Sequence, residues 1–269
     1  EFNLSGGFMQ VTLTALSLLL ATALPLAAQH SGECDHEAQR NATVDANGAR
    51  LLRLEAGSGS LKVEGKPGLN RVVVRGRACA SSASLLEQVT LTGQRSGADV
   101  VIAANVQRNR DGWNYRDGEY ARLDVVIEVP AGMAAEIDDG SGSMDLSNLG
   151  SVRIEDGSGE IVADNLQGDV DIDDGSGEIR LVDVTGRIKI EDGSGSIRLE
   201  NVGGLIDIDD ASGEIEIRTA RNSVRISDAS GGIDVRDVAG DFIVADDGSG
   251  GIDYDNVRGR VDIPRKKRR

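Results

Sequence analysis

Residues 173–208 read DDGSGEIRLVDVTGRIKIEDGSGSIRLENVGGLIDI, a stretch that repeats its pattern after eighteen positions. Within each unit, every nine-residue half has glycine at its fifth position and aliphatic residues at its seventh and ninth. Aliphatic residues two apart, with a polar residue between them, point to the same face of a short strand. Each unit therefore predicts two strands and two glycine-containing turns, which together form one coil.

The same period extends over most of the chain. A turn of Gly or Ala followed by Ser-Gly recurs with spacings of 17, 18, 18, 18, 18 and 19 residues, beginning at Gly140, Gly157, Gly175, Gly193, Ala211, Ala229 and Gly248. One coil buries about five aliphatic side chains at ~1.5–3 kcal/mol each, which does not offset ~1–2 kcal/mol of backbone entropy for every residue. A coil is stable only when it is stacked on others. The sequence thus predicts an all-β fold, a two-sheet parallel β-solenoid (β-helix) of about seven 18-residue coils over residues 131–263.

Charge at one outward-facing position supports this register. The residue between the aliphatic pair of each second half alternates in sign from coil to coil, apart from one apolar member; the series is Arg153, Asp171, Lys189, Asp207, Arg225, Ile243 and Asp262. Neighbouring coils of a parallel stack lie ~4.8 Å apart, so we expect a ladder of oppositely charged neighbours. Each pair stabilises little, but a slipped register would lose the whole set.

Residues 50–130 show the same alternation with longer insertions. The segment 51–65, LLRLEAGSGSLKVEG, repeats the Gly-Ser-Gly turn, and the segments 71–80, RVVVRGRACA, and 123–132, LDVVIEVPAG, alternate as strands. We interpret residues 50–130 as an irregular β cap together with the first coils of the same solenoid. A separate small β-domain is the alternative.

The N-terminal region predicts export. Residues 9–28, MQVTLTALSLLLATALPLAA, begin with Met and continue with an apolar run and small residues near Ala28, the pattern of a signal peptide. The run is too short and too rich in Ala and Thr for a membrane span, and no later stretch approaches ~18 continuous apolar residues, so we expect no transmembrane segment. We interpret residues 1–8 as upstream sequence and residues 29–49 as a polar leader. The expected location is the periplasm, the outer surface or the extracellular space.

The chain has two cysteines, Cys34 and Cys79. An even number of cysteines in an oxidising compartment favours a disulfide between them. The alternative is a metal site formed by His30, Cys34 and His36, but no second cluster of ligands accompanies these residues.

An acidic pair precedes nearly every Gly/Ala-Ser-Gly turn. The second members of the pairs are Asp139, Asp156, Asp174, Asp192, Asp210, Asp228 and Asp247. In one interpretation each of these aspartates accepts hydrogen bonds from the amides of its turn, while the first acid of the pair points into solvent. In the other, the stacked carboxylates bind Ca²⁺, which prefers carboxylate and carbonyl oxygens. The repeat lacks the GGxGxDxUx spacing of calcium β-rolls, which weighs against the second interpretation.

The opposite turn carries mostly amides and short acids. These residues are Asn148, Asn165, Asp183, Asn201, Thr219, Asp237 and Asn256. Amides in register hydrogen-bond to each other along a stack of strands. We expect this row to stabilise the structure without a binding role.

Two further groups of residues lie outside the repeat. Trp113, Tyr115 and Tyr120 form the only dense group of aromatic residues in the sequence, and they either stack on a sugar or cover the end of the core. The tail at 264–269, PRKKRR, is strongly basic in a chain of net charge −16. It either contacts anionic lipid or polysaccharide or, with its proline and cations, blunts the open end of the solenoid against end-to-end association.

These residues resemble a known family. The VPAG turn at Val129–Gly132, followed by units of the form x-x-Ser-Gly-x-Ile-x-Leu-x-x-Val-x-Gly-x-Ile-x-Ile, is similar to the bacterial adhesin-like β-strand-repeat family catalogued as domain of unknown function 4097. The likeness covers roughly residues 50–263. It implies an exported β-solenoid with a role in adhesion, and it brings no catalytic residues. The chain departs from the family pattern in the acidic pair before each turn.

The sequence therefore predicts an exported, non-enzymatic β-solenoid, a structural or adhesin-like protein of the bacterial envelope or surface. Its expected partners are polysaccharides or proteins of the cell surface or extracellular space. A calcium-binding solenoid that uses the repeated aspartates is the first alternative. An enzyme acting on polysaccharide is the second, although the acidic pairs are many and alike, whereas glycoside hydrolysis needs two carboxylates that differ in environment. An exported acidic chain is not expected to bind nucleic acid.

Overall fold

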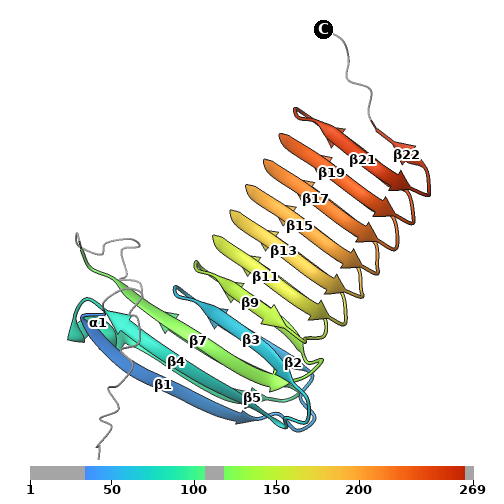
Figure 1. The fold of residues 1–269 in the computed structure, drawn as a ribbon. Coiled ribbons are helices and arrows are strands. Elements are labelled where there is room, and N and C mark those ends of the chain that lie inside the picture. Colours follow the sequence, from blue (N-terminus) through green and yellow to red (C-terminus); the bar gives the residue numbers. More distant parts are fainter. Residues whose placement is uncertain (1–33, 107–117, 264–269) are drawn as a thin grey trace, which may run out of the picture. The chain divides into compact units, whose positions relative to one another are not determined.

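The computed structural model of the chain describes residues 34–106 and 118–263. The described part is all-β, with 22 strands and one helix, α1 (Ala83–Gln88), and its strands form two sheets of eleven. Figure 1 shows the strands from β9 onward stacked side by side, each coil supplying one strand to each sheet. The predicted upstream residues 1–8, signal peptide 9–28 and basic tail 264–269 lie outside the described residues.

Both sheets follow the stack from one end to the other. In spatial order, the first sheet, here sheet A, contains β1 (His36–Asp45), β4 (Arg71–Ala80), β7 (Ala121–Pro130), β3 (Leu61–Lys66), β9 (Met144–Ser147), β11 (Gly159–Leu166), β13 (Gly177–Val184), β15 (Gly195–Val202), β17 (Gly213–Ala220), β19 (Gly231–Val238) and β21 (Ile252–Val257). The second, sheet B, contains β5 (Val89–Ser96), β6 (Asp99–Val106), β2 (Leu51–Ala56), β8 (Ala134–Asp139), β10 (Val152–Asp156), β12 (Val170–Asp174), β14 (Ile188–Asp192), β16 (Ile206–Asp210), β18 (Val224–Asp228), β20 (Phe242–Asp247) and β22 (Val261–Asp262).

Coils stack in the register that the eighteen-residue period predicts. In sheet B, Asp156 pairs with Asp174 and Asp174 with Asp192 in a parallel ladder. In sheet A, Ile179 pairs with Ile197 in the same way. The predicted two-sheet parallel solenoid is confirmed. The one irregularity in the ladders between described coils after β8 is a register shift after Ile226, where the repeat lengthens to nineteen residues.

The core is a column of aliphatic side chains between the two sheets. Ile179 and Leu181 of β13 face Ile188 and Ile190 of β14, and each of the four is at most 1% exposed. Alternation along the strand determines which residues face inward, since successive side chains point to opposite faces. Each coil continues the column of the one before it, as stacking requires.

The Ser-Gly glycine of each turn lies directly over its counterpart in the neighbouring coil. At Gly195 an added Cβ would overlap the carbonyl oxygen of Gly177, and at Gly177 it would overlap that of Gly159. Gly195 also has φ +152°, in the range that L side chains rarely adopt. Glycine is therefore required at this position for coils to approach to their hydrogen-bonding distance.

Substitution Gly195→Ala is expected to destabilise the protein by about 3 kcal/mol, because the methyl group forces two coils apart. Gly232→Ala is the matched control, since no heavy atom lies within 4 Å of a Cβ built at Gly232. Its effect should stay within about 0.5 kcal/mol. Urea unfolding followed by circular dichroism compares the two variants, and equal losses of stability would show that the glycine contact is not what limits stacking.

The predicted charge ladder on sheet B is present. Arg153 pairs in register with Asp171, their side chains forming an ion pair at 3.1 Å, and Arg225 lies 3.8 Å from Asp207. Lys189 stands between Asp171 and Asp207 in the ladder, but its ion pair is with Glu191 of its own strand. All these side chains are about half exposed, so each pair contributes at most about 1 kcal/mol.

The strands of residues 50–130 join the same two sheets as the regular coils, but not in chain order. The coil formed by β2 and β3 lies between the coil of β6 and β7 and the coil of β8 and β9. The β2–β3 coil thus comes first in the sequence, and the two coils that lie on either side of it are formed by later residues. Strands β1, β4 and β5 then close the end of the stack with antiparallel pairings.

Residues 36–45 differ from the polar leader expected over 29–49. They form β1, which pairs along its whole length with β4 and buries Val44. A disulfide joins Cys34, just before β1, to Cys79 near the end of β4, with the two Cα atoms 5.6 Å apart. The alternative metal site that included Cys34 is wrong, because its sulfur is bonded to Cys79.

The two ends of the stack differ. The antiparallel strands cover the first end, whereas β21 and β22 at the other end have a neighbour on one side only among the described strands. Ile252 and Val261 are only partly buried there, and Tyr254 is 49% exposed, with its ring 5.9 Å from that of Phe242. None of the described helices is long and apolar enough to cross a membrane.

Candidate functional site

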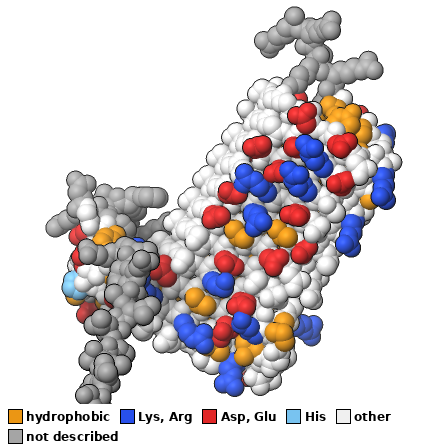
Figure 2. Space-filling model, viewed as in Figure 1, with side chains coloured by type: hydrophobic (Ala, Val, Ile, Leu, Met, Phe, Trp, Pro, Cys, Tyr) orange, Lys and Arg blue, Asp and Glu red, His pale blue; other side chains and the backbone are white. Residues whose placement is uncertain are grey.

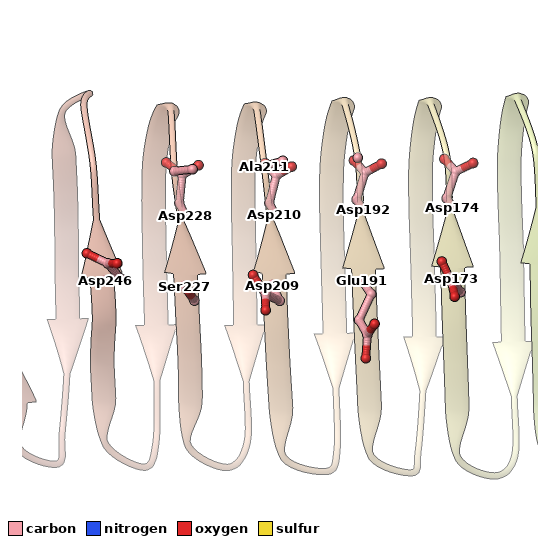
Figure 3. Close-up of a pocket in the computed structure, with 12 residues that line it drawn as sticks. Asp173, Asp174, Glu191, Asp192, Asp209, Asp210, Ala211, Ser227, Asp228 and Asp246 are labelled. Atoms are coloured by element: carbon pink, nitrogen blue, oxygen red, sulfur yellow. The ribbon is translucent and has the colours of Figure 1, made fainter.

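The acidic pairs form two parallel rows at the ends of the sheet B strands. The inner row consists of the second member of six of the seven pairs and is buried: Asp139, Asp156, Asp174, Asp192, Asp210 and Asp228, at 1–7% exposure. The seventh second member, Asp247, is only partly buried. The outer row consists of the first member and is exposed: Asp138, Glu155, Asp173, Glu191, Asp209 and Asp246, with Ser227 in one coil. Figure 3 shows both rows repeating at the same level in successive coils.

Five of the six inner-row side chains accept a hydrogen bond from the serine amide of their own turn, whereas the amide of Ser141, in the turn after Asp139, donates to the carbonyl of Gly57. The Oδ1 atom of Asp174 accepts a hydrogen bond from the amide of Ser176 at 3.1 Å, and Oδ1 of Asp210 accepts from that of Ser212 at 3.0 Å. The same bond is made by Asp156, Asp192 and Asp228. This confirms the interpretation of the second aspartate as an acceptor of turn amides, with the first acid in solvent.

The other oxygen of each inner-row carboxylate has no hydrogen-bond partner. This holds for Oδ2 of all six residues, each of which is fully shielded from solvent. A buried charge without a partner is costly, and a neighbouring carboxylate of like charge adds to the cost. Burial first, and then the neighbouring carboxylates Asp156 or Asp192, raise the pKa of Asp139, Asp174 and Asp210 from 3.8 to about 6. Burial likewise raises the pKa of Asp156, Asp192 and Asp228, which alternate with these three residues along the row.

The inner row therefore makes the folded protein less stable as pH rises. The folded state holds these protons more tightly than the unfolded chain, so protonation favours folding below pH ~4 and the benefit is lost between pH ~4 and ~6. A pKa moved from 3.8 to about 6 corresponds to roughly 3 kcal/mol for one residue. This dependence is opposite to that of a carboxylate held in an ion pair.

Asp210→Asn should raise the unfolding temperature at pH 7.5 and give no advantage at pH 4.5. The amide keeps the acceptor for Ser212, carries no charge and has a donor to offer a neighbouring Oδ2. Asp209→Asn, in the exposed outer row, is the control and should show no such pH dependence. Thermal melting at both pH values tests this, and an Asp210→Asn variant equally destabilised at both would contradict it.

A shallow groove of about 430 Å³ follows this edge. It extends from Asp173 and Asp174 in one coil to Asp246 four coils further on, and both rows contribute to its lining. Figure 3 views the same groove, with carboxyl groups in every coil it crosses. The groove is therefore acidic throughout its length.

Calcium binding at this edge stays a prediction. Within residues 34–106 and 118–263, no three His, Cys, Asp or Glu side chains are grouped so that they could hold a metal ion. The inner-row residues lie one coil apart, each with one oxygen committed to its own turn. The unpartnered Oδ2 atoms are the feature that a cation would satisfy.

If the row binds Ca²⁺, millimolar CaCl₂ should raise the unfolding temperature by several degrees at pH 7.5, and chelator should reverse the gain. The Asp174→Asn/Asp192→Asn variant should lose the response. A melting temperature that is the same in CaCl₂ and in chelator, at matched ionic strength, would remove the hypothesis.

The row of amides on the opposite turn has a conformational role that the sequence analysis missed. All seven residues have positive φ, between 52° and 61°. Asn and Asp tolerate this left-handed conformation, while Thr219, a β-branched residue, is strained in it. The expected ladder is present in part: the side-chain amide of Asn165 donates to Oδ1 of Asn148 at 2.7 Å, and that of Asn256 to Oδ1 of Asp237. The recurrence of Asn and Asp at this position was the sequence signal from which a left-handed backbone conformation could have been predicted.

The aromatic group does not come together as a described site. Trp113 and Tyr115 lie outside the described residues. Tyr120 precedes β7, where its backbone amide donates to Ser81 Oγ at 3.0 Å and its hydroxyl accepts from the amide of Asp35 at 3.1 Å. Tyr120 thus helps to hold the start of the chain beside the disulfide.

Comparison with known proteins identifies the family. The family model described as Toastrack DUF4097 matches residues 87–258, which is more than half of the chain. No curated protein matches the chain. Among solved structures, a protein from Clostridium sporogenes whose description proposes a role in cell adhesion aligns with a TM-score of 0.39 and 16% identity, over 81% of this chain and 99% of its own. The chain belongs to the Toastrack family of domains of unknown function, as the repeat motif indicated.

Proposed function

We propose that the protein is an exported, non-enzymatic scaffold of the bacterial envelope or surface that binds surface partners in an adhesin-like way. The observation that carries this proposal is the repetition of the same outward positions in every coil. A surface of this kind offers many equivalent contacts along its length. Such repetition suits multivalent attachment, in which weak individual contacts add up to strong binding.

The arrangement of acids argues against a glycoside hydrolase. Hydrolysis of a glycosidic bond needs one carboxyl group that is protonated and another that is ionised, in different environments and within one cleft. Here the two rows repeat the same two environments in coil after coil. No described coil therefore has a pair of carboxyl groups whose environments set it apart from the pairs in the other coils.

The face of sheet A is the candidate contact surface. Figure 2 shows side chains of both charge signs interspersed over the face formed by β9 to β21. Arg180 and Arg198 are in-register neighbours of like charge, an arrangement that costs stability. Arg198 pairs with Glu178 and lies 3.6 Å from Glu216. Basic side chains placed next to each other at this cost suit an anionic partner, such as an acidic polysaccharide or an acidic protein segment.

Export is supported by the disulfide between Cys34 and Cys79. Disulfides persist in oxidising compartments outside the cytosol and are rare within it. The predicted signal peptide at 9–28 agrees with this.

Localisation in intact cells tests the proposal. Antibody raised against the purified protein should label intact cells, or cells whose outer membrane alone has been permeabilised, with a cytosolic protein as the negative control.

Purified protein should bind envelope fractions, and Arg180→Glu/Arg198→Glu should weaken this binding at least fivefold while Arg225→Glu, on sheet B, does not. Labelling seen only after complete lysis would contradict export, and absence of binding to any envelope fraction would contradict the adhesive role.

A further inference from the structure

Two exposed carboxylates of the acidic groove have no cation to pair with. Asp173 and Asp209 are the in-register neighbours of Glu191 in the outer row. Lys189 forms an ion pair with Glu191 on its own strand, and Figure 3 shows the Glu191 carboxyl group turned away from the inner row. Among the described residues, neither Asp173 nor Asp209 forms an ion pair. The groove therefore keeps two unneutralised acids on either side of a neutralised one.

The floor of the groove adds buried carboxylates to these two. Asp174, Asp192 and Asp210 line it, and each is at most 5% exposed. One oxygen of each accepts the hydrogen bond of its own turn, and the other has no hydrogen-bond partner. A cation held over this floor lowers the cost of burying these charges, because an opposite charge nearby favours the ionised form. The buried residues thus point to a cationic ligand independently of the exposed ones.

The carboxylates are spread along a line instead of converging on one point. Coils lie ~4.8 Å apart, so Asp173 and Asp209, two coils apart in the ladder, are separated by roughly 10 Å. A calcium ion needs its oxygen ligands within about 2.6 Å and does not reach both. An extended basic peptide presents side chains on one face only every ~6.6 Å, which does not match the coils. The groove therefore favours a ligand whose charges recur about every 5 Å.

A linear polyamine with three-carbon spacers has this spacing. When extended, it places successive ammonium groups about 5 Å apart, so the two ends of a triamine are about 10 Å apart. Alkylammonium groups are charged at neutral pH and carry several N–H donors, which carboxylates accept in strong hydrogen bonds. The groove crosses five coils and is long enough for such a chain.

We propose that the acidic groove binds a linear polyamine along the axis of the stack. Its terminal ammonium groups pair with Asp173 and Asp209, and its central one lies over Asp192. The three contacts belong to one molecule, so weak individual ion pairs add up to a measurable affinity. The ligand of this edge is then an organic cation and not a metal ion. The proposal does not depend on the adhesive role of sheet A.

Titration calorimetry with bis(3-aminopropyl)amine, at pH 7 and low salt, tests the site. The triamine should bind saturably, and Asp173→Asn/Asp209→Asn should weaken the affinity at least tenfold. The control Asp164→Asn/Glu200→Gln removes two exposed carboxylates with the same two-coil spacing from sheet A, and it should change the affinity less than twofold. Absence of binding at millimolar triamine, or equal losses in the two variants, would overturn the proposal.

A second ligand separates spacing from charge. Bis(6-aminohexyl)amine carries the same three charges, but its six-carbon spacers place them about 9 Å apart. It should bind the parent protein at least fivefold more weakly than the three-carbon triamine, because only one of its charges at a time meets an unpaired carboxylate. Equal affinity for the two triamines would show that charge alone accounts for the binding, and the assignment to a ligand matched to the coil spacing would be wrong.

Discussion

Every level of this structure depends on how closely one coil can lie on the next. The ladder hydrogen bonds between coils require neighbouring backbones at ~4.8 Å, and at the Ser-Gly turns this brings the backbone of one glycine against the carbonyl of the glycine before it. A side chain at Gly177 or Gly195 would keep the coils apart. The repeated glycine therefore sets the spacing, and the period of eighteen residues keeps identical positions in contact from coil to coil.

Stacking identical residues has different energetic consequences for different side chains. Aliphatic residues gain from it, because each layer extends the core of the last. Amides gain too where a donor meets an acceptor, as between Asn165 and Asn148. Stacked carboxylates destabilise the fold, since each inner-row aspartate lies next to another aspartate of like charge in the neighbouring coil. On the exposed face of sheet B the sequence avoids this by alternating charge. In the inner row it does not, and the raised pKa values of Asp174 and Asp210 are the result.

The repeated coils could be predicted from the sequence because all the information lies within eighteen residues. Glycine spacing and alternating aliphatics set the strands, their register and the facing of each residue. The cap could not be predicted in the same way. Its antiparallel pairings and the placement of β2 and β3 between later coils depend on contacts between distant segments, for which the local pattern has no signal. Residues 36–45 were expected to be a polar leader because only Val44 of that strand is buried. For the site, the pattern identified both acidic rows, but not which oxygen would lack a partner, since that depends on the turn geometry.

The position of the β2–β3 coil also limits how this protein can change in length during evolution. That coil is enclosed by the β6–β7 coil on one side and by the β8–β9 coil on the other, so no unit can be inserted there without rebuilding the crossing connections. Beyond β9, each eighteen-residue unit contacts only its predecessor and its successor. Loss of one unit would bring like charges together on sheet B, because the sign there alternates from coil to coil, whereas loss or duplication of two adjacent units keeps the alternation. A change of reach by two coils at a time would therefore leave the closed end and the charge alternation of this protein intact.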